Sequence, residues 1–321
     1  MNAILDNFSN PALLFFLLGI IASQIKSDLQ IPETSAKFIS VYLLLSIGFK
    51  GGQELIHAHA GLKVLTYSLI GIASAFLFPL LSFRILKKRM GVDNAAAIAA
   101  SYGSVSAVTF ITAIAFLDEK NIPYGSFMIA AMALMEVPAI IVGVFMVNRN
   151  STNHSRSSFS SIIKHAITNG SVFLLIGSLL IGMITSDKQA DGIRPFTTDI
   201  FKGFLTVFLL DMGLSAGRQL KGLWKNGPFV LAFSILTPIF QGITLMAISS
   251  LIIHEPGNLF LMGILGASAS YIAVPAAMRQ AVPKADPGIY LPMALGMTFP
   301  FNIIAGLPLY WFIAQALVAG N

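Results

Sequence analysis

Long apolar stretches alternate with short polar ones along almost the whole chain. Most of the apolar stretches approach the ~20 residues that an α-helix needs to cross a lipid bilayer. The pattern therefore predicts an all-α membrane protein with ten transmembrane helices, or spans. The predicted spans cover residues 10–25, 38–54, 62–86, 93–117, 123–147, 170–186, 195–217, 228–253, 259–280 and 290–317.

One long polar segment divides the ten spans into two sets of five. It begins NRNSTNHSRSSFSSIIKH at Asn148 and is rich in Ser and Asn. We predict a first five-helix repeat in residues 1–147, a cytoplasmic linker in 148–169 and a second five-helix repeat in 170–321. The linker is interpreted as a flexible connection, and docking of a regulator is the alternative.

The two sets of spans share sequence matches in the same order. LSIGFKGGQEL from Leu45 resembles LDMGLSAGRQL from Leu210, and MALMEVP from Met132 resembles MALGMTFP from Met293. All such matches are offset by 159 to 165 positions. A repeat with an odd number of spans inserts its second copy in the opposite orientation, so we predict two inverted five-helix repeats, as in many secondary transporters.

Composition agrees with a bilayer environment and removes several functional classes. The mean hydropathy is +0.79, and charged residues make up 11% of the chain, against about 25% in soluble domains. The absence of cysteine excludes disulfides and thiolate chemistry. No HExxH zinc motif, nucleophile elbow or P-loop occurs, so we expect no enzyme and no metal beyond a possible Na⁺.

The charges also predict an orientation. If the N-terminus lies outside, fourteen Lys and Arg residues fall in cytoplasmic loops and five fall outside. This bias follows the positive-inside rule, and it accounts for the net charge of +6 without nucleic-acid binding. We therefore predict that both termini lie outside and that the linker lies in the cytoplasm.

Spans four and nine are the best candidates for a binding site, because AASYGSVSAVTF and GASASYIAVPAAM are rich in small and hydroxyl residues. Pro275 removes a backbone donor and clashes with the carbonyl of Tyr271, which predicts a broken helix. Such a break exposes N–H groups and a positive dipole end to a small anion. Close packing of small residues is the alternative. The predicted anion-binding residues are Gly103, Ser104, Val105, Ser106, Thr109, Ser268, Ala269, Ser270 and Tyr271.

Three charged residues are predicted to lie deep in the membrane, where each costs ~2.5–3.5 kcal/mol on insertion scales and needs a partner or a function. Lys50 and Asp211, in the matched spans two and seven, are predicted to form an ion pair, either structural or as a gate. Glu136 is predicted to bind the coupling cation, with Ser101 and Ser270 nearby. A structural acid is the alternative for Glu136.

Several segments resemble the SbtA-type sodium-dependent bicarbonate transporter family. They are SYGSVSAVTF, FLDEKNIPYGSF, MEVPAIIVG and YLPMALGMTFPFNIIAGLPLYWFIAQ, which keep the family's order over nearly the whole chain. The resemblance implies a core domain and a gate domain, a homotrimer in a bacterial inner membrane, and bicarbonate uptake driven by Na⁺. It also implies a PII-like regulatory partner, although the linker is shorter here than in many relatives.

Two positions depart from the family pattern, which has an Asp and a Ser where this chain has Tyr271 and Ala273. Coupling to sodium or to protons therefore stays open. We predict a secondary transporter that imports bicarbonate, with Na⁺ as coupling ion and no cofactor. The alternatives are a sodium- or proton-coupled transporter of another small anion, such as a carboxylate, and a membrane sensor that binds the anion without transporting it.

Overall fold

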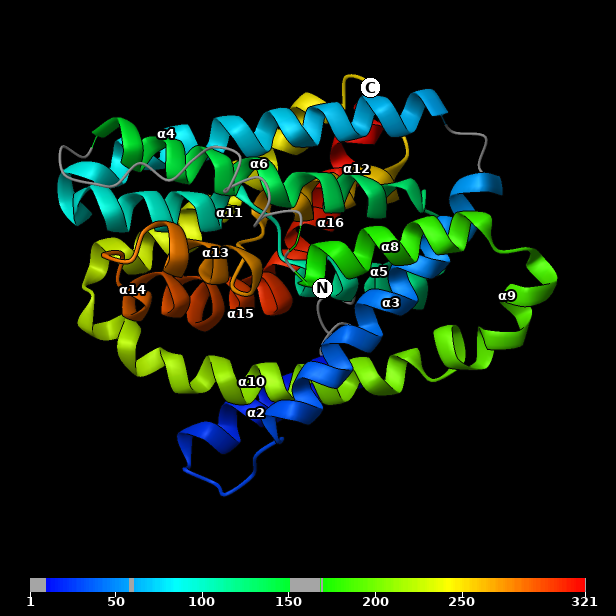
Figure 1. Cartoon of the computed structure of the whole chain (residues 1–321), viewed down its shortest axis with the longest axis horizontal. Helices are drawn as coiled ribbons and strands as arrows, with labels where there is room; N and C mark the ends of the chain where they lie inside the picture. Colours follow the sequence, from blue (N-terminus) through cyan, green and yellow to red (C-terminus); the bar gives the residue numbers. More distant parts are fainter. Residues whose placement is uncertain (1–9, 58–60, 151–167, 169, 321) are drawn as a thin grey trace.

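The computed structural model describes residues 10–57, 61–150, 168 and 170–320, and every regular element among them is helical (Figure 1). The predicted linker of residues 148–169 lies almost wholly outside the described residues, so its role stays a prediction. The elements, with π-helical segments marked η, are α2 (Pro11–Gln24), α3 (Glu33–His57), α4 (Gly61–Gly103), α5 (Ala107–Glu119), α6 (Phe127–Asn150), α8 (Gly170–Ile184), α9 (Asp187–Arg194), η1 (Pro195–Asp199), α10 (Phe201–Lys225), α11 (Pro228–Ser249), α12 (Pro256–Ala267), α13 (Ala273–Ala281), α14 (Pro287–Leu291), η2 (Pro292–Thr298), α15 (Phe299–Phe301), η3 (Asn302–Gly306) and α16 (Leu307–Ala319).

Helix boundaries follow from local chemistry. Asn10 caps α2, because its Oδ1 accepts a hydrogen bond from the backbone N–H of Ala12 at 2.8 Å. Gly91, with φ of 74°, interrupts the helical conformation within α4. An L side chain rarely adopts this conformation, so glycine permits a turn here. The predicted boundary between spans three and four therefore lies at Gly91.

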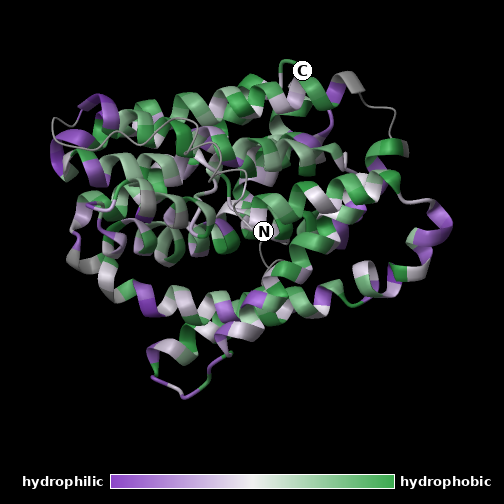
Figure 2. Ribbon diagram, viewed as in Figure 1, coloured by the Kyte–Doolittle hydropathy of each residue, from purple (hydrophilic) through white to green (hydrophobic). Residues whose placement is uncertain are grey.

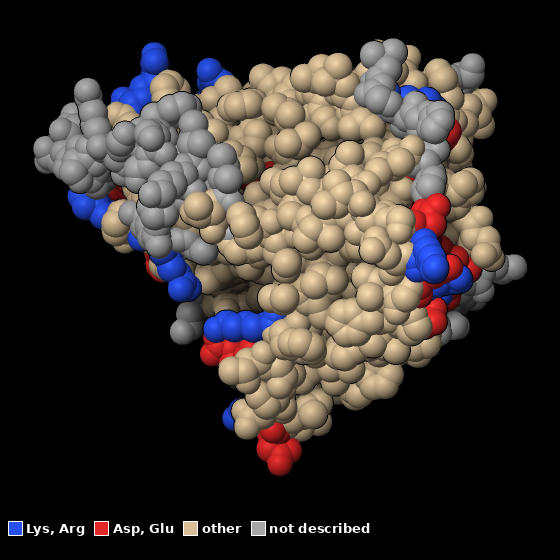
Figure 3. Space-filling model, turned by 45° about the vertical axis from the view of Figure 1, so that its right-hand side comes forward, with Lys and Arg blue, Asp and Glu red and all other residues tan. Residues whose placement is uncertain are grey.

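Apolar surface covers the middle of the molecule, and polar residues gather toward its ends. Figure 2 shows hydrophilic residues at the two ends of the long axis, including α9 at one of them. In Figure 3, Lys, Arg, Asp and Glu flank a broad uncharged surface. In the described part of the chain, five helical stretches are long and apolar enough to cross a membrane. They are Lys63–Glu119, Phe127–Asn150, Asp187–Leu220, Pro228–Ser249 and Pro287–Ala319.

The helices are thus those of a multi-pass membrane protein. The stretch Lys63–Glu119 contains two predicted spans, and α2, α8 and α12 are shorter apolar helices that coincide with three others. The ten-span inverted arrangement stays a prediction, because helix length and composition do not fix how often the chain crosses the bilayer.

Four helices, α2, α3, α8 and α10, form one packed group, which we call the four-helix group (Figure 1). Within it α2 packs on α10, and α3 packs on α8. A Cβ at Gly19 would lie 3.0 Å from Cα of Gly213, and a Cβ at Gly52 would lie 3.0 Å from Cα of Gly182. The absence of side chains lets the two backbones of each pair approach closely.

The remaining long helices form a larger second group, in which α4 packs on α6, and α12 packs on both α11 and α16. The C-terminal stretch contains the π-helical segments η2 and η3, close to Pro292, Pro300 and Pro308. Proline has no N–H to donate to the α-helical ladder, which favours such local widening. The polar side chain of Asn302, the first residue of η3, is fully buried.

Candidate functional site

Span four is broken after Gly103, where α4 ends, and the helix resumes as α5 at Ala107. Ser106 caps the new helix, because its Oγ accepts a hydrogen bond from the N–H of Thr109 at 3.2 Å. A Cβ at Gly103 would lie 2.0 Å from Cγ of Pro79. Glycine is therefore required at the end of α4 for the proline of span three to pack there.

Span nine is broken between Ala267, the last residue of α12, and Ala273, the first residue of α13. Pro275 lies in the first turn of α13, where its missing N–H costs no helical hydrogen bond. Oγ of Ser270 accepts a hydrogen bond from the N–H of Val274 at 3.3 Å. The predicted break is present, and Pro275 begins the second segment.

The two breaks contact each other directly. The N–H of Ser270 donates to the carbonyl of Ser101 at 2.8 Å, and the N–H of Ser106 donates to Oγ of Ser268 at 3.0 Å. Two segments more than 160 positions apart in sequence therefore satisfy each other's free backbone groups. Non-helical backbone at membrane depth is tolerated when other protein groups satisfy it in this way.

Polar side chains from other spans complete the hydrogen bonding of the breaks. Nδ2 of Asn302 donates to the carbonyl of Ala267 at 2.8 Å, at the end of α12. The amide of Gln241, oriented by its hydrogen bonds, donates to the carbonyls of Tyr102 at 2.9 Å and Gly266 at 3.3 Å. Gln241 thus bridges the ends of α4 and α12, and it joins the two breaks.

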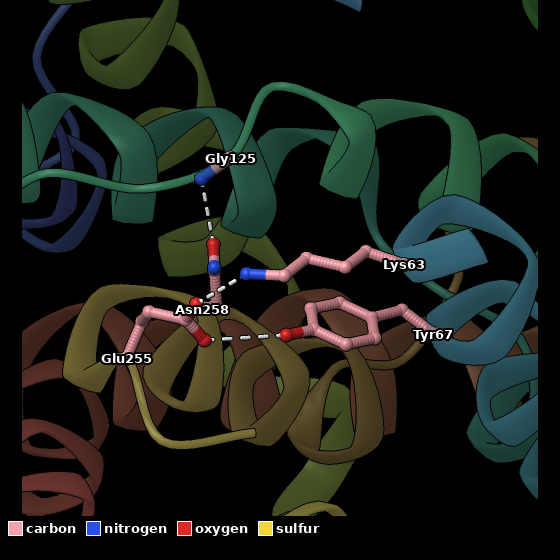
Figure 4. A network of polar contacts seen from close by, with 5 residues as sticks. All are labelled: Lys63, Tyr67, Gly125, Glu255 and Asn258. Carbon is pink, nitrogen blue, oxygen red and sulfur yellow. Dashed lines mark hydrogen bonds and ion pairs between the residues drawn. The ribbon is translucent and has the colours of Figure 1, made fainter. Parts of the chain in front are cut away.

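The far end of α12 is fixed by a surface network (Figure 4). Nζ of Lys63 lies 2.6 Å from Oε1 of Glu255, and the hydroxyl of Tyr67 donates to Oε2 of Glu255 at 3.3 Å. The N–H of Gly125 donates to Oδ1 of Asn258 at 2.6 Å. Contacts from α4 and from the segment before α6 therefore hold the helix that leads into the second break.

Both breaks border one cavity of about 30 Å³. A cavity of this size holds one or two water-sized groups. The cavity as it stands therefore has room for one small inorganic ion, and a second ion would bind there only if its walls move apart. The lining residues from the second group are Val105, Ser106, Ala107, Val108, Ile111, Glu136, Ser270, Tyr271, Ile272 and Ala273; those from the four-helix group are Ser40, Leu43, Leu44, Ser171 and Phe208.

The beginnings of α5 and α13 both meet this cavity. The N–H groups of Ala107, Val108 and Ala273 belong to first turns and have no acceptor within their own helices. Each helix also directs the positive end of its dipole there. Among the described residues, no Lys, Arg or His lines the cavity, so these two helix ends supply the positive potential seen there.

Glu136 on α6 is the acidic residue of the cavity wall. Its side chain is almost fully buried, and its Oε2 has no hydrogen-bond partner among the described residues. An unpaired buried carboxylate costs several kcal/mol unless a cation or a proton neutralises it. The cavity therefore combines donors suited to an anion with an acid suited to a cation.

This combination agrees with the comparison to known families. The chain matches the sequence model of the Na⁺-dependent bicarbonate transporter superfamily over residues 11–315. The protein belongs to this superfamily. Membership confirms the resemblance found in the sequence and places the chain among transporters rather than enzymes. A search of curated proteins finds no significant match.

Five of the residues predicted to bind ions line the cavity of this superfamily member: Val105, Ser106, Glu136, Ser270 and Tyr271. The other predicted residues are buried around the breaks but do not line it: Ser101, Gly103, Ser104, Thr109, Ser268 and Ala269. Ser101 and Ser268 accept hydrogen bonds across the breaks, and Gly103 packs on Pro79. The contacts of these three residues stabilise the breaks, and ion binding by the six residues outside the lining stays a prediction.

The ion pair predicted between Lys50 and Asp211 is not formed. Nζ of Lys50 lies 3.9 Å from Oε1 of Glu54, one turn along the same helix, and no ion pair within the described ranges joins it to Asp211. The helices α3 and α10 run antiparallel, because Tyr42 stacks near Phe204 while Lys50 shares a pocket with Lys202. Asp211 lies in the opposite direction along α10, which separates the two charges.

Lys50 instead lines a second pocket. This pocket is bordered by α3, α5 and α10, which also border the first cavity, and it lies nearer one end of the molecule. On α5, Ile111 faces the first cavity while Ile114 and Asp118 face the second pocket, three to four residues apart on one helix face. The charged residues that line the second pocket are Lys50, Glu54, Asp118 and Lys202. The sequence predicts that this end faces outside.

Sequence reasoning missed Gln241, Asn302 and the cavity serines of the four-helix group. The signal for the first two was available, because a polar side chain within an apolar span is costly and needs a partner. Ser40 and Ser171 carry no such signal, because single serines are common in membrane helices. Their place in the cavity wall depends on packing between groups.

Proposed function

We propose that this transporter imports bicarbonate together with Na⁺, and that both ions bind in the cavity between the two helix breaks. The observation that carries the proposal is the convergence of two helix N-termini and one buried carboxylate on a single small cavity. Superfamily membership supports bicarbonate and Na⁺ as the ions. Their identity in this chain is part of the proposal.

The anion binds at the starts of α5 and α13. Free N–H groups of Ala107, Val108 and Ala273 donate to its oxygens, and the hydroxyls of Ser106 and Ser270 add donors. Each hydroxyl oxygen already accepts a bond from its own helix, at Thr109 and Val274, which leaves its O–H free to donate. A small planar oxyanion fits this set of short, convergent donors.

The cation binds at Glu136. Its unpartnered carboxylate oxygen supplies one hard ligand of the kind that Na⁺ and protons share. The charges of cation and anion offset each other in a buried cavity, so each ion favours binding of the other. This mutual dependence couples the sodium gradient to bicarbonate uptake.

Transport follows from motion of the four-helix group against the second group, because both groups contribute walls to the cavity. Such motion exposes the cavity alternately at the two ends. The pocket at Lys50 and Lys202 provides the route from the outside.

The proposed inverted repeat explains how the protein could adopt an outward-open and an inward-open state of related structure. A Cβ at Gly48 would lie 2.8 Å from Cβ of Ser178, and a Cβ at Gly213 would lie 3.1 Å from Cα of Gly19. Gly48 and Gly213 share one position in LSIGFKGGQEL and LDMGLSAGRQL, and Gly19 and Ser178 differ by 159 positions, an offset of the repeat. Equivalent residues thus make equivalent contacts, which supports two related halves.

The remaining parts of the proposal come from the resemblance and from the charge distribution. The protein lies in a bacterial inner membrane with both termini outside, and it assembles as a homotrimer. A PII-like regulator of the linker would act from the cytoplasm.

The direct test is uptake of radiolabelled bicarbonate by proteoliposomes with an inward sodium gradient. We expect accumulation that disappears when choline replaces sodium. Uptake that persists in choline and follows an inward proton gradient would replace Na⁺ by H⁺ in the proposal. Binding without any accumulation would assign the protein to anion sensing.

Glu136→Gln and Glu33→Gln form a matched pair for this assay. Glu33 is an exposed carboxylate that pairs with Lys37 at 2.7 Å, so its replacement should leave uptake unchanged. Glu136→Gln should abolish the sodium dependence. Unchanged sodium dependence in Glu136→Gln would remove this residue from the cation site.

A further inference from the structure

A groove between α4 and α6 carries basic side chains that the proposed transport cycle does not use. It has a volume of about 500 Å³. Within the described ranges, its lining contains four basic residues and no acidic one. The lining residues are Leu80, Phe83, Arg84, Lys87, Lys88, Phe145, Met146, Arg149 and Asn150. The sequence predicts that this end of the molecule faces the cytoplasm.

The basic residues of the groove have no acidic partner: the ion pairs formed within the described ranges lie elsewhere. Nζ of Lys87 donates to Oδ1 of Asn150 at 2.6 Å, and Nδ2 of Asn150 donates to the carbonyl of Met146 at 2.8 Å. These two bonds hold the ammonium group of Lys87 against α6. By contrast, Arg89 lies outside the lining, with its guanidinium 4.3 Å from the ring centre of Phe229.

The groove is charged at one end and apolar at the other. Leu80 precedes Lys87 by seven residues on α4, which is about 10 Å along a helix. Phe145 precedes Arg149 by about one turn on α6, and its side chain is 51% exposed. Both walls therefore change from aliphatic or aromatic to basic in the same direction. A ligand that fits both ends has an anionic head and an apolar tail.

We propose that this groove binds one anionic phospholipid. Its phosphodiester lies among Arg84, Lys87, Lys88 and Arg149, and its acyl chains cover Leu80, Phe83, Phe145 and Met146. Lys and Arg near the cytoplasmic surface attract anionic head groups, and basic pockets between membrane helices bind them. A free phosphate would satisfy the charges but leave the apolar end of the groove uncovered.

The test measures lipid affinity by native mass spectrometry of the purified full-length protein in detergent, with phosphatidylglycerol, phosphatidylcholine and inorganic phosphate as separate probes. The variant Arg84→Gln/Lys87→Gln/Arg149→Gln removes three charges from the groove. We expect it to bind phosphatidylglycerol roughly 100-fold more weakly than wild type. Its affinity for phosphatidylcholine should not change.

The matched control is Lys37→Gln/Lys188→Gln/Arg194→Gln, which removes three exposed basic residues that do not line the groove. It should bind phosphatidylglycerol like wild type. The single variant Arg149→Gln, expected to weaken binding roughly fivefold, serves if the triple variant does not fold.

Three results would overturn the proposal. They are equal wild-type affinities for the two lipids, equal phosphatidylglycerol affinities of the groove and control variants, and occupancy by inorganic phosphate that displaces the lipid. Because the readout is lipid binding, failure of bicarbonate uptake does not affect it.

Discussion

The two helix breaks occupy comparable places but are built differently. The first is short, has a true side-chain cap in Ser106, and is fixed by the contact of Gly103 with Pro79. The second spans Ser268 to Ile272, has Oγ of Ser270 as acceptor for the N–H of Val274 in place of a cap at Ile272, and leads into a helix of nine residues. Ile272 is 44% exposed, whereas Val105 in the first break is fully buried.

The contrast indicates that the first half of the site is the more rigid one. The first break holds its N–H groups at a fixed position, because the Ser106 cap and the contact of Gly103 with Pro79 both constrain the backbone. Among the residues that the structure describes, the second break has no proline packed against a glycine and is supported at the end of α12 by Asn302, whereas Gln241 supports both breaks. We infer that α13 moves more than α5 when ions bind, so overpacking at the first break should cost more stability than overpacking at the second.

The largest effect is expected from adding a methyl group at Gly103. Its Cβ would lie 2.0 Å from Cγ of Pro79, and overpacking of this kind costs about 1–3 kcal/mol or more. Gly103→Ala should therefore lower the melting temperature and the monodisperse yield strongly. Gly266→Ala, at the second break, meets its nearest atom at 2.9 Å and should have a smaller effect.

Gly177→Ala is the control for these two variants, because no atom of the described residues lies within 4 Å of its Cβ. It should melt like wild type. A wild-type melting temperature for Gly103→Ala would show that the first break is not rigid.

Gln241→Leu should have the next largest effect, because it leaves the carbonyls of Tyr102 and Gly266 without their donor. A buried polar group that loses its partner costs about 1–3 kcal/mol. We expect a lower melting temperature together with reduced uptake, since both breaks lose support. Gln189→Leu, on the exposed helix α9, should change neither quantity; equal melting of the two variants would contradict the bridging role.

Alanine at the two serines should weaken both stability and uptake. Ser106→Ala removes the bond to the N–H of Thr109, and Ser270→Ala removes the comparable bond to the N–H of Val274. Loss of such a bond at a helix start costs about 1 kcal/mol, so each variant should lower the melting temperature. Both hydroxyls are proposed donors to the anion, so each variant should also raise the bicarbonate concentration for half-maximal uptake. The Thr variants keep the hydroxyl and should restore most of each property. A wild-type half-maximal concentration in both alanine variants would remove these hydroxyls from the anion site.

The smallest effect on stability is expected from the contact of Lys63 with Glu255, at the start of α12. The hydrogen bond from Lys63 lowers the pKa of Glu255 below its ordinary value of 4.5. A lowered pKa stabilises the fold above that value, and the stabilisation is lost as pH falls through the folded-state pKa. Exposed pairs contribute about 0–1 kcal/mol. Lys63→Gln should thus lower the melting temperature slightly at neutral pH, and the difference from wild type should shrink on acidification. A constant difference would exclude the carboxylate as its cause.

The sequence predicted the breaks because their causes are local. Pro275, Gly103 and the serines beside them act on their own backbone, so their effect is visible without a structure. Glu136 was also visible, because a carboxylate in an apolar span stands out. The sequence could not show which neighbouring hydroxyl lines the cavity. Ser106 does and Ser104 does not, and this depends on the direction that the turn gives each side chain.

The error at Lys50 has a simple physical origin. Symmetry between spans two and seven suggested a contact with Asp211, but related positions in two repeats need not touch. Glu54 lies four residues after Lys50, a spacing that brings side chains together on one helix face. The local partner was therefore present in the sequence, whereas the antiparallel course of α3 and α10 required the fold.

The most direct test of the central claim measures bicarbonate affinity at several sodium concentrations, and sodium affinity at several bicarbonate concentrations, by calorimetry on the purified protein. If both ions share the cavity, each must raise the affinity of the other by the same factor. We predict equal factors in wild type and no mutual effect in Glu136→Gln. Bicarbonate affinity that is independent of sodium in wild type would contradict the account.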